Sequence, residues 1–244
     1  LYIVSTPIGN LADLTYRAVK TLQDVHCICA EDTRVTKTLL THYNITTPVL
    51  SYHDHNETYV TPGLIERLKK GEDIALVTDA GTPGIADPAF YIVRAAIAEG
   101  IKVIPVPGAS AVLGSLVCSG LPCEKYIFEN FLPHKSAQRI RIFESLKNET
   151  RTVVFYETPH RILKVLNELK LTLGTANIVI ARELTKIHEE FLRGSPDELL
   201  AHFEKKPPKG EMVVLINTRD NFTLQQAKSD ISPEIETDNN GEDE

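Results

Sequence analysis

The segment ALVTDAGTPGIADP, residues 75–88, joins a short apolar run to a loop that contains two glycines and two prolines. The run ALVT predicts a buried strand, and ligands of open α/β sheets bind beyond the carboxyl ends of the strands. Glycines let the backbone of such a loop approach a ligand closely, and Asp79 and Asp87 can accept hydrogen bonds from ribose hydroxyls or an amino group. The segment therefore predicts a ligand-binding turn, with a rigid turn that binds nothing as the alternative.

The rest of the first half alternates apolar runs with helical patterns, which predicts parallel strands in an α/β sheet. Further strands are predicted at residues 1–5, 25–30, 102–106 and 48–53. Helices are predicted near residues 13–22, 33–42, 62–70 and 89–99.

The alternation restarts after residue 124. Strands are predicted at residues 125–129, 151–157, 177–182, 188–194 and 211–216, and helices at 136–147, 159–171 and 196–203. The last strands follow one another closely, which predicts a mixed sheet with some antiparallel pairing. We therefore predict an N-terminal α/β domain (1–122), a C-terminal α/β domain (123–219) and an acidic, disordered tail (220–244).

The composition is that of a soluble globular protein, because 42% of the 244 residues are hydrophobic and 24% are charged. The tail holds eight acids and one lysine, which accounts for the whole formal net charge of −7. Residues 1–219 hold 25 charges of each sign and so do not exclude an anionic partner. The uncharged stretch 103–122 is interrupted by prolines and glycines, which argues against a membrane span. The four cysteines fit no disulfide framework, and we expect a cytoplasmic protein.

Two other predicted strands also end in polar turns. The turn at residues 107–111 follows strand 102–106, and Ser110 can cap the next helix, whose first amides can bind a polar ligand. Ordinary capping explains the same pattern. The turn at residues 5–10 has one glycine only, so a dinucleotide-binding G-x-G-x-x-G motif is absent and a dehydrogenase is disfavoured. The pair His53 and His55 lacks a third ligand nearby, and no metal is predicted.

Charged clusters mark two further segments. Glu31-Asp32-Thr33-Arg34 follows strand 25–30, where acids and a base can position a substrate hydroxyl, although helix capping by Asp32 or Thr33 is the alternative. Residues 134–164 hold seven lysines and arginines and three acids, a net charge of +4. Such a stretch is typical of a surface that meets a phosphate-rich partner, and a solvated helix face is the alternative.

Ten motifs occur in order along residues 1–217: TPIGNLADLT, EDTRVTKTLL, HDHNE, VTDAGTPGIADP, PGASA, SGLP, FLPHK, FYETPHR, ARELTK-x-HEE and KGEMVVL. Together they resemble the ribosomal RNA small-subunit methyltransferase I group of the tetrapyrrole methylase superfamily. The resemblance implies two α/β domains of the tetrapyrrole methylase type that hold S-adenosylmethionine in the cleft between them, in a homodimer. It also implies 2′-O-methylation of a cytidine ribose in the decoding region of small-subunit ribosomal RNA.

Individual residues are assigned to three roles, and the resemblance supplies the first of them. The implied cofactor-binding residues are Pro7, Ala80, Gly81, Thr82, Ile85, Ser110, Ala111, Glu157 and Leu184. A ribose hydroxyl is a poor nucleophile that needs a nearby base or cation, and the candidates for this catalytic role are Asp32, Lys135, Glu183 and Lys186. The residues predicted to contact RNA are Arg34, Lys135, Arg139, Arg141 and Arg161.

The chain departs from the family pattern in two places. Asn130 stands before FLP where the family has glycine, and because asparagine tolerates positive φ we expect the turn to survive. An acidic tail stands where family members carry a small helical extension.

Two other functions stay open at this point. An enzyme of the same fold could methylate a small tetrapyrrole-like substrate, and a non-catalytic rRNA-binding assembly factor could retain the fold. The motifs EDTR, FLPHK and ARELTK match the RNA-acting branch of the superfamily and disfavour the small-molecule enzyme.

Overall fold

A parallel five-stranded sheet forms the first half of the chain in a computed structural model that describes residues 1–174 and 176–218. Its strand order is β3-β2-β4-β1-β5, and all of its pairs are parallel. The bounds are β1 Tyr2–Val4, β2 Cys27–Ala30, β3 Val49–Ser51, β4 Ile74–Val77 and β5 Ile104–Val106. The strands β2 and β4 are buried along their whole length, as expected for central parallel strands covered on both faces.

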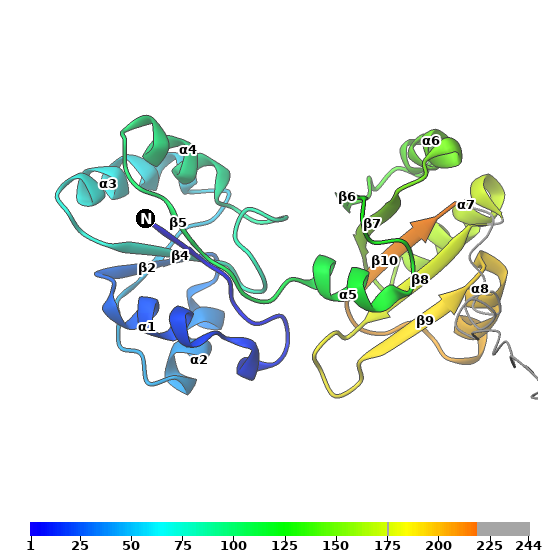
Figure 1. The fold of residues 1–244 in the computed structure, drawn as a ribbon, viewed down its shortest axis with the longest axis horizontal. Helices are drawn as coiled ribbons and strands as arrows, with labels where there is room; N and C mark the ends of the chain where they lie inside the picture. The colour runs from blue at the N-terminus through cyan, green and yellow to red at the C-terminus, as the bar shows by residue number, and fades with distance from the viewer. Residues whose placement is uncertain (175, 219–244) are drawn as a thin grey trace, which may run out of the picture.

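Helices cover both faces of this sheet (Figure 1). One face packs against α1 (Tyr16–Asp24) and α2 (Thr33–His42), which follow the short 3-10 helix η1 (Leu11–Asp13) and share one apolar core with β1, β2 and β4. The other face packs against α3 (Glu57–Lys69) and α4 (Phe90–Ala98). The predicted helix 62–70 begins earlier than expected, at Glu57, and contains Pro62 in its interior.

The second sheet is mixed, as predicted. Its order is β6-β7-β10-β8-β9, with β6 and β7 parallel and the other pairs antiparallel. The bounds are β6 Tyr126–Phe131, β7 Thr152–Glu157, β8 Asn177–Arg182, β9 Glu190–Gly194 and β10 Met212–Asn217. One face packs against α6 (Ser136–Ser145), with the 3-10 helix η2 (Leu146–Asn148), α7 (Ile162–Leu173) and α8 (Pro196–Lys205).

The opposite face of the second sheet is covered by α5 (Ala111–Ser119). Val112 and Leu116 of this helix pack with Leu121 against Val179 and Val213 of the sheet. The helix therefore belongs by packing to the second unit, although it precedes the predicted boundary at residue 122. The structural divide lies in the turn at residues 107–110, between β5 and α5, as Figure 1 shows.

The predicted acidic tail (220–244) lies outside the described residues. Within the described part of the chain, no helix has the length and apolar character needed to cross a membrane.

Candidate functional site

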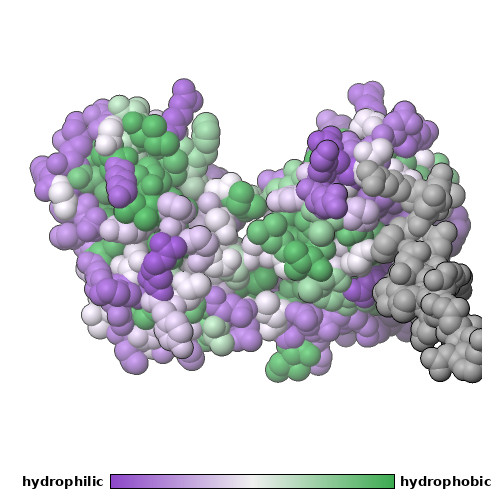
Figure 2. Space-filling view, in the orientation of Figure 1, coloured by the Kyte–Doolittle hydropathy of each residue, from purple (hydrophilic) through white to green (hydrophobic). Residues whose placement is uncertain are grey.

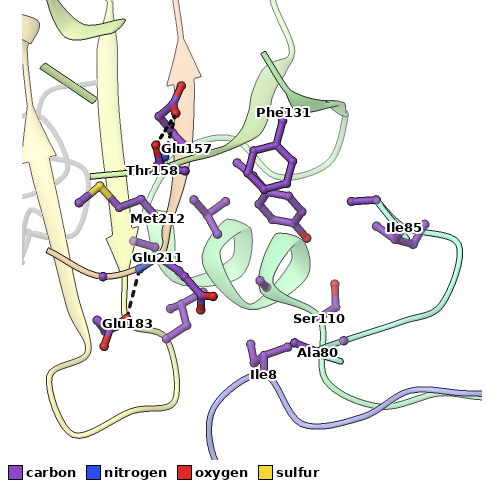
Figure 3. A pocket seen from close by; sticks show the side chains of 18 of the residues that line it. Ile8, Ala80, Ile85, Ser110, Phe131, Glu157, Thr158, Glu183, Glu211 and Met212 are labelled. Atoms are coloured by element: carbon purple, nitrogen blue, oxygen red, sulfur yellow. Dashed lines mark hydrogen bonds between the residues drawn. The ribbon is translucent and has the colours of Figure 1, made fainter. Parts of the chain in front are cut away.

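A cavity of about 550 Å³ lies between the two units. Figure 2 shows the molecule hollowed there, with apolar side chains gathered on the wall that the second unit forms. In Figure 3, Ile8, Ala80, Ile85 and Ser110 of the first-unit loops and the following turn face Phe131, Glu157, Glu183, Glu211 and Met212 across this space. The cavity thus lies where the carboxyl ends of strands from both sheets converge, the usual position of a ligand in α/β folds.

The first-unit wall is held by a bridge between two loops. The amide of Thr6 donates to the carbonyl of Gly81 at 2.8 Å, and the amide of Gly81 donates back to Thr6 at 3.2 Å. The hydroxyls of Ser5 and Thr82 are hydrogen-bonded at 2.8 Å. Gly81 has a φ of +90°, a conformation that side chains rarely adopt. This loop is therefore rigid, and it presents bare backbone to the cavity.

The second-unit wall carries a cluster of three charged side chains. Lys186 Nζ donates to Glu183 Oε1 and to Glu211 Oε2, each at 3.0 Å. The hydrogen bond from Lys186 lowers the pKa of Glu183. Burial lowers the pKa of Lys186, but the hydrogen bonds to Glu211 and Glu183 outweigh it, and the resulting pKa is raised. The Lys186 ammonium group therefore lies between the carboxyl groups of Glu183 and Glu211.

The loop that carries this cluster is strained and fits closely against the first unit. Glu183 and Thr185 have φ values of +51° and +65°, which is uncommon outside glycine and a genuine outlier for a β-branched threonine. A Cβ on Gly9 would lie 2.7 Å from Lys186 Cγ and 2.9 Å from Thr185 Oγ1. The close approach of Gly9 therefore fixes where the Lys186 side chain enters the cavity.

Asp87 has the most strongly shifted carboxyl pKa among the acids that line the cavity. Burial raises the pKa of Asp87 to about 6, and the charges of Glu31 and Asp79 act in the same direction, against a hydrogen bond with Thr78. The interpretation of Asp87 as a polar group of the ligand-binding turn is consistent with its position in the cavity lining. A carboxyl with this pKa is a competent proton acceptor near neutral pH.

Every residue assigned to the cofactor by resemblance except Pro7 lines the cavity. These residues are Ala80, Gly81, Thr82, Ile85, Ser110, Ala111, Glu157 and Leu184. Pro7 lines an adjoining cavity of about 370 Å³ on the first unit. The two cavities share Ile8 and Ala80, so Pro7 lies just beyond the predicted site.

The four catalytic candidates divide into two pairs. Glu183 and Lys186 line the cavity, whereas Asp32 and Lys135 do not. Asp32 caps α2 by accepting from the amide of Arg34 at 2.8 Å, and its carboxylate pairs with the Arg34 guanidinium at 2.6 Å. The capping interpretation of this motif is therefore correct, and Arg34 is engaged with Asp32. Lys135 precedes α6 and is exposed.

Some lining residues had no predicted role: Ile8, Phe131, Tyr156, Gly210, Glu211 and Met212. Tyr156 and the run 210–212 lie inside the motifs FYETPHR and KGEMVVL, which is the one signal that could have found them. Asn130, which precedes Phe131, has a φ of +56°, so the expected positive-φ turn is confirmed.

The structure corrects the interpretation of Arg139 as an RNA contact. Its side chain is 4% exposed and forms a bidentate pair with Glu168, at 2.7 Å from Nε and 2.6 Å from Nη2. Its Nη1 donates to the carbonyls of Pro133 and His134. Arg139 therefore supports the loop before α6 from inside the unit. Arg141, two residues later, is exposed and stays a predicted RNA contact.

We expect Arg139→Met to destabilise the protein by about 3 kcal/mol, because it leaves the Glu168 carboxylate buried without its partner. Urea unfolding measures this loss, and Arg141→Met is the matched exposed control, expected to change stability by less than about 0.5 kcal/mol. The double variant Arg139→Met/Glu168→Leu should recover most of the loss. Equal effects of the two single variants would contradict the structural role of Arg139.

Among the described residues, no three His, Cys, Asp or Glu side chains are arranged to hold a metal ion.

Comparisons with known proteins place the chain in a family. Residues 1–200 match the model of the tetrapyrrole (corrin/porphyrin) methylases. A relative from Synechocystis sp., named ribosomal RNA small subunit methyltransferase I, is 50% identical over 217 residues, which cover 88% of this chain and 78% of the relative. A relative of the same name from Thermotoga maritima is 46% identical over 220 residues, 90% of this chain and 99% of the relative.

Solved structures agree in fold at low sequence identity. A diphthine synthase superposes with a TM-score of 0.68 at 13% identity, covering 88% of each chain. The methyltransferase CobJ superposes with a TM-score of 0.64 at 16% identity, covering 88% of this chain and 92% of CobJ. The chain therefore belongs to the tetrapyrrole (corrin/porphyrin) methylase family, in the group whose members are named ribosomal RNA small subunit methyltransferase I.

Proposed function

We propose that the chain transfers a methyl group from S-adenosylmethionine to the ribose 2′-hydroxyl of a cytidine in the decoding region of small-subunit ribosomal RNA. Sequence identity of 44–50% to relatives with this substrate class in their names supports the RNA substrate. The observation that carries the proposal is the cavity at the converging strand ends, lined by nearly every residue that the family resemblance assigns to the cofactor.

The residues of the cavity fit a cationic methyl donor. Four carboxyl groups line the cavity, from Asp87, Glu157, Glu183 and Glu211, against the ammonium of Lys186 and the Arg161 guanidinium that faces Glu157 from behind the lining. Such a lining favours the sulfonium and ammonium charges of S-adenosylmethionine. The donor supplies an electrophilic methyl group, so no side chain has to form a covalent intermediate.

The backbone offers further polar groups to the donor. Gly81 leaves its side of the cavity open, and Ser110 caps α5 by accepting from the amide of Leu113. The preceding amides of Ala111 and Val112 make no hydrogen bond within the described part of the chain. Free amides at a helix start bind carboxylates and other polar groups, and we assign them to holding the donor.

We assign the acceptance of the hydroxyl proton to Asp87. Glu183 is a weaker base than an ordinary glutamate because its pKa is lowered, and Lys186 is protonated because its pKa is raised. Asp87, with a pKa of about 6, is half ionised just below neutral pH. The Lys186 ammonium is then suited to stabilise the negative charge that develops on the 2′-oxygen of the ribose.

The proposed function is tested by incubating the purified protein with labelled S-adenosylmethionine and small ribosomal subunits. Digestion of the RNA to nucleosides should place the label on 2′-O-methylcytidine. A parallel reaction with a tetrapyrrole acceptor should stay unlabelled. Label on the tetrapyrrole alone would indicate the small-molecule enzyme, and binding of subunits without any transfer would indicate an assembly factor.

We also propose that the chain acts as a homodimer in the cytoplasm, where ribosomes are assembled. The exposed apolar residues Leu113 and Val117, one turn apart on α5, together with Tyr126, are available for such a contact. Light scattering at micromolar concentration should give twice the mass of the chain. The mass of a single chain would exclude the dimer.

A further inference from the structure

A further cavity, of about 510 Å³, lies within the second unit. Residues just before and within α6 and α7 line it: His134, Ser136, Arg139, Arg161, Lys164, Asn167 and Glu168. No residue lines both cavities, but two short loops connect them. We call this cavity the basic pocket.

The two loops join the basic pocket to the cavity of the proposed methyl donor. One runs from Phe131, which lines the donor cavity, to His134, which lines the basic pocket. The other runs from Thr158 in the donor cavity to Arg161 in the basic pocket. Loops of this length reach at most about 14 Å. A strand of RNA that places a ribose in the first cavity can therefore reach the second.

Two arginine–glutamate pairs support the walls of the basic pocket and form its frame. Glu168 accepts hydrogen bonds from Nε and Nη2 of the Arg139 guanidinium and from Ser136 Oγ at 2.6 Å. Arg161 Nη2 donates to the carbonyls of Leu132 and Pro133, while its Nε lies 3.2 Å from Glu157 Oε1. Because each acid of the frame already faces an arginine, the frame adds little net charge to the pocket.

Two donors of the pocket have no acceptor among the described residues. Lys164 is exposed and makes no ion pair among the described residues, and Arg161 Nη1 likewise makes no hydrogen bond there. No side chain caps the first amides of α6, whereas the first amide of α7, from Ile162, already donates to the carbonyl of Thr158. An uncompensated lysine, a free guanidinium nitrogen and the uncapped start of α6 around one cavity together favour a phosphate group.

We propose that the basic pocket binds a backbone phosphate of the RNA substrate, close along the strand to the methylated ribose. Lys164 and Arg161 Nη1 contact the phosphate oxygens, and Arg139 holds the loop that separates the two cavities. This inference rests on the proposed function for the identity of the RNA, but the pocket's preference for a phosphodiester follows from its own residues.

The test compares Lys164→Gln with Lys164→Arg and with Lys147→Gln. Lys147 is exposed and without an ion pair among the described residues. It lies in η2, beyond the end of α6, so its removal changes net charge without touching the pocket. Binding of a short single-stranded RNA and methyl transfer to small ribosomal subunits are measured at several salt concentrations. Calorimetry with S-adenosylmethionine reports on the donor cavity.

Lys164→Gln should weaken RNA binding severalfold near 0.1 M salt and lower the slope of log affinity against log salt by about one unit. The KM for subunits should rise while kcat and donor affinity stay unchanged, and Lys164→Arg should restore both slope and KM. An unchanged salt slope in Lys164→Gln, or an equal loss of RNA affinity in Lys147→Gln, would contradict the proposed phosphate site.

The two proposals can fail separately. If the protein methylates ribosomal RNA but the salt dependence of RNA binding is the same in Lys164→Gln as in the wild type, the proposed phosphate site is wrong and the proposed function stands. A Lys164-dependent slope for the short RNA, in a protein that transfers no methyl group to ribosomal RNA, would support the pocket and remove the proposed function.

Discussion

Gly81→Val should abolish measurable binding of S-adenosylmethionine, with an affinity loss of about a hundredfold or more. The φ of +90° at Gly81 is strained for any side chain. A Cβ there would lie 3.5 Å from Ile8 Cγ2 and 3.9 Å from the carbonyl of Ala109, so the methyl groups of valine would fill the floor of the cavity. Gly81→Ala, with the Cβ alone, should lose less affinity. Calorimetry with the donor measures both.

The matched control for this prediction is Gly100→Val. Gly100 follows α4, has a φ of +69° and has open space around the position of a Cβ. Both valine variants should lose about 1–3 kcal/mol of stability through backbone strain. Only the variant at residue 81 should lose the donor. Equal affinities for S-adenosylmethionine in the two variants would contradict the proposal that the donor binds at this turn.

Asp87→Asn should lower kcat for methyl transfer by at least about a hundredfold, the usual contribution of a positioned general base. In the wild-type enzyme only the ionised form of Asp87 accepts a proton. Since the pKa of Asp87 is about 6, kcat/KM should therefore rise from pH 5 to 7 and level off above. The variant should lose this dependence while its affinity for the donor changes far less. Quenched single-turnover reactions across this pH range measure both the loss of rate and the loss of pH dependence.

Glu31→Gln provides the control for the pH dependence. The charge of Glu31 helps to raise the pKa of Asp87, so its removal should shift the rise in kcat/KM to lower pH and leave the plateau in place. A profile in Asp87→Asn that still rises near pH 6 would assign the titrating group to another residue.

The turns of the donor cavity were predictable because their signals are local. A strand followed by glycines and prolines specifies the loop at 79–88 without reference to the rest of the chain, and the carboxyl ends of parallel strands meet at one edge. Ser110 likewise caps the helix that directly follows it. The alternation of elements predicted both sheets, and the close spacing of the last strands predicted the mixed character of the second.

Features that depend on distant partners were not predictable in the same way. The local sequence around Arg139 is typical of an exposed basic helix. The side chain is buried because it pairs with Glu168, which lies 29 residues later on α7. Glu211 enters the cavity because β10 pairs with β8 and brings it beside Glu183. The assignment of α5 to the second unit follows from contacts with β7, β8 and β10, all of which come later in the chain. In each case the position of the residue or helix depends on a contact with a distant part of the chain, which the local sequence pattern does not specify.

The most direct measurement is mass spectrometry of small-subunit ribosomal RNA from cells that lack this protein, compared with cells that regain it. One 2′-O-methylcytidine in the decoding region should be lost in the absence of the protein, restored by the wild-type chain and not restored by Asp87→Asn. An unchanged set of ribose methyl groups in cells without the protein would contradict the proposed function.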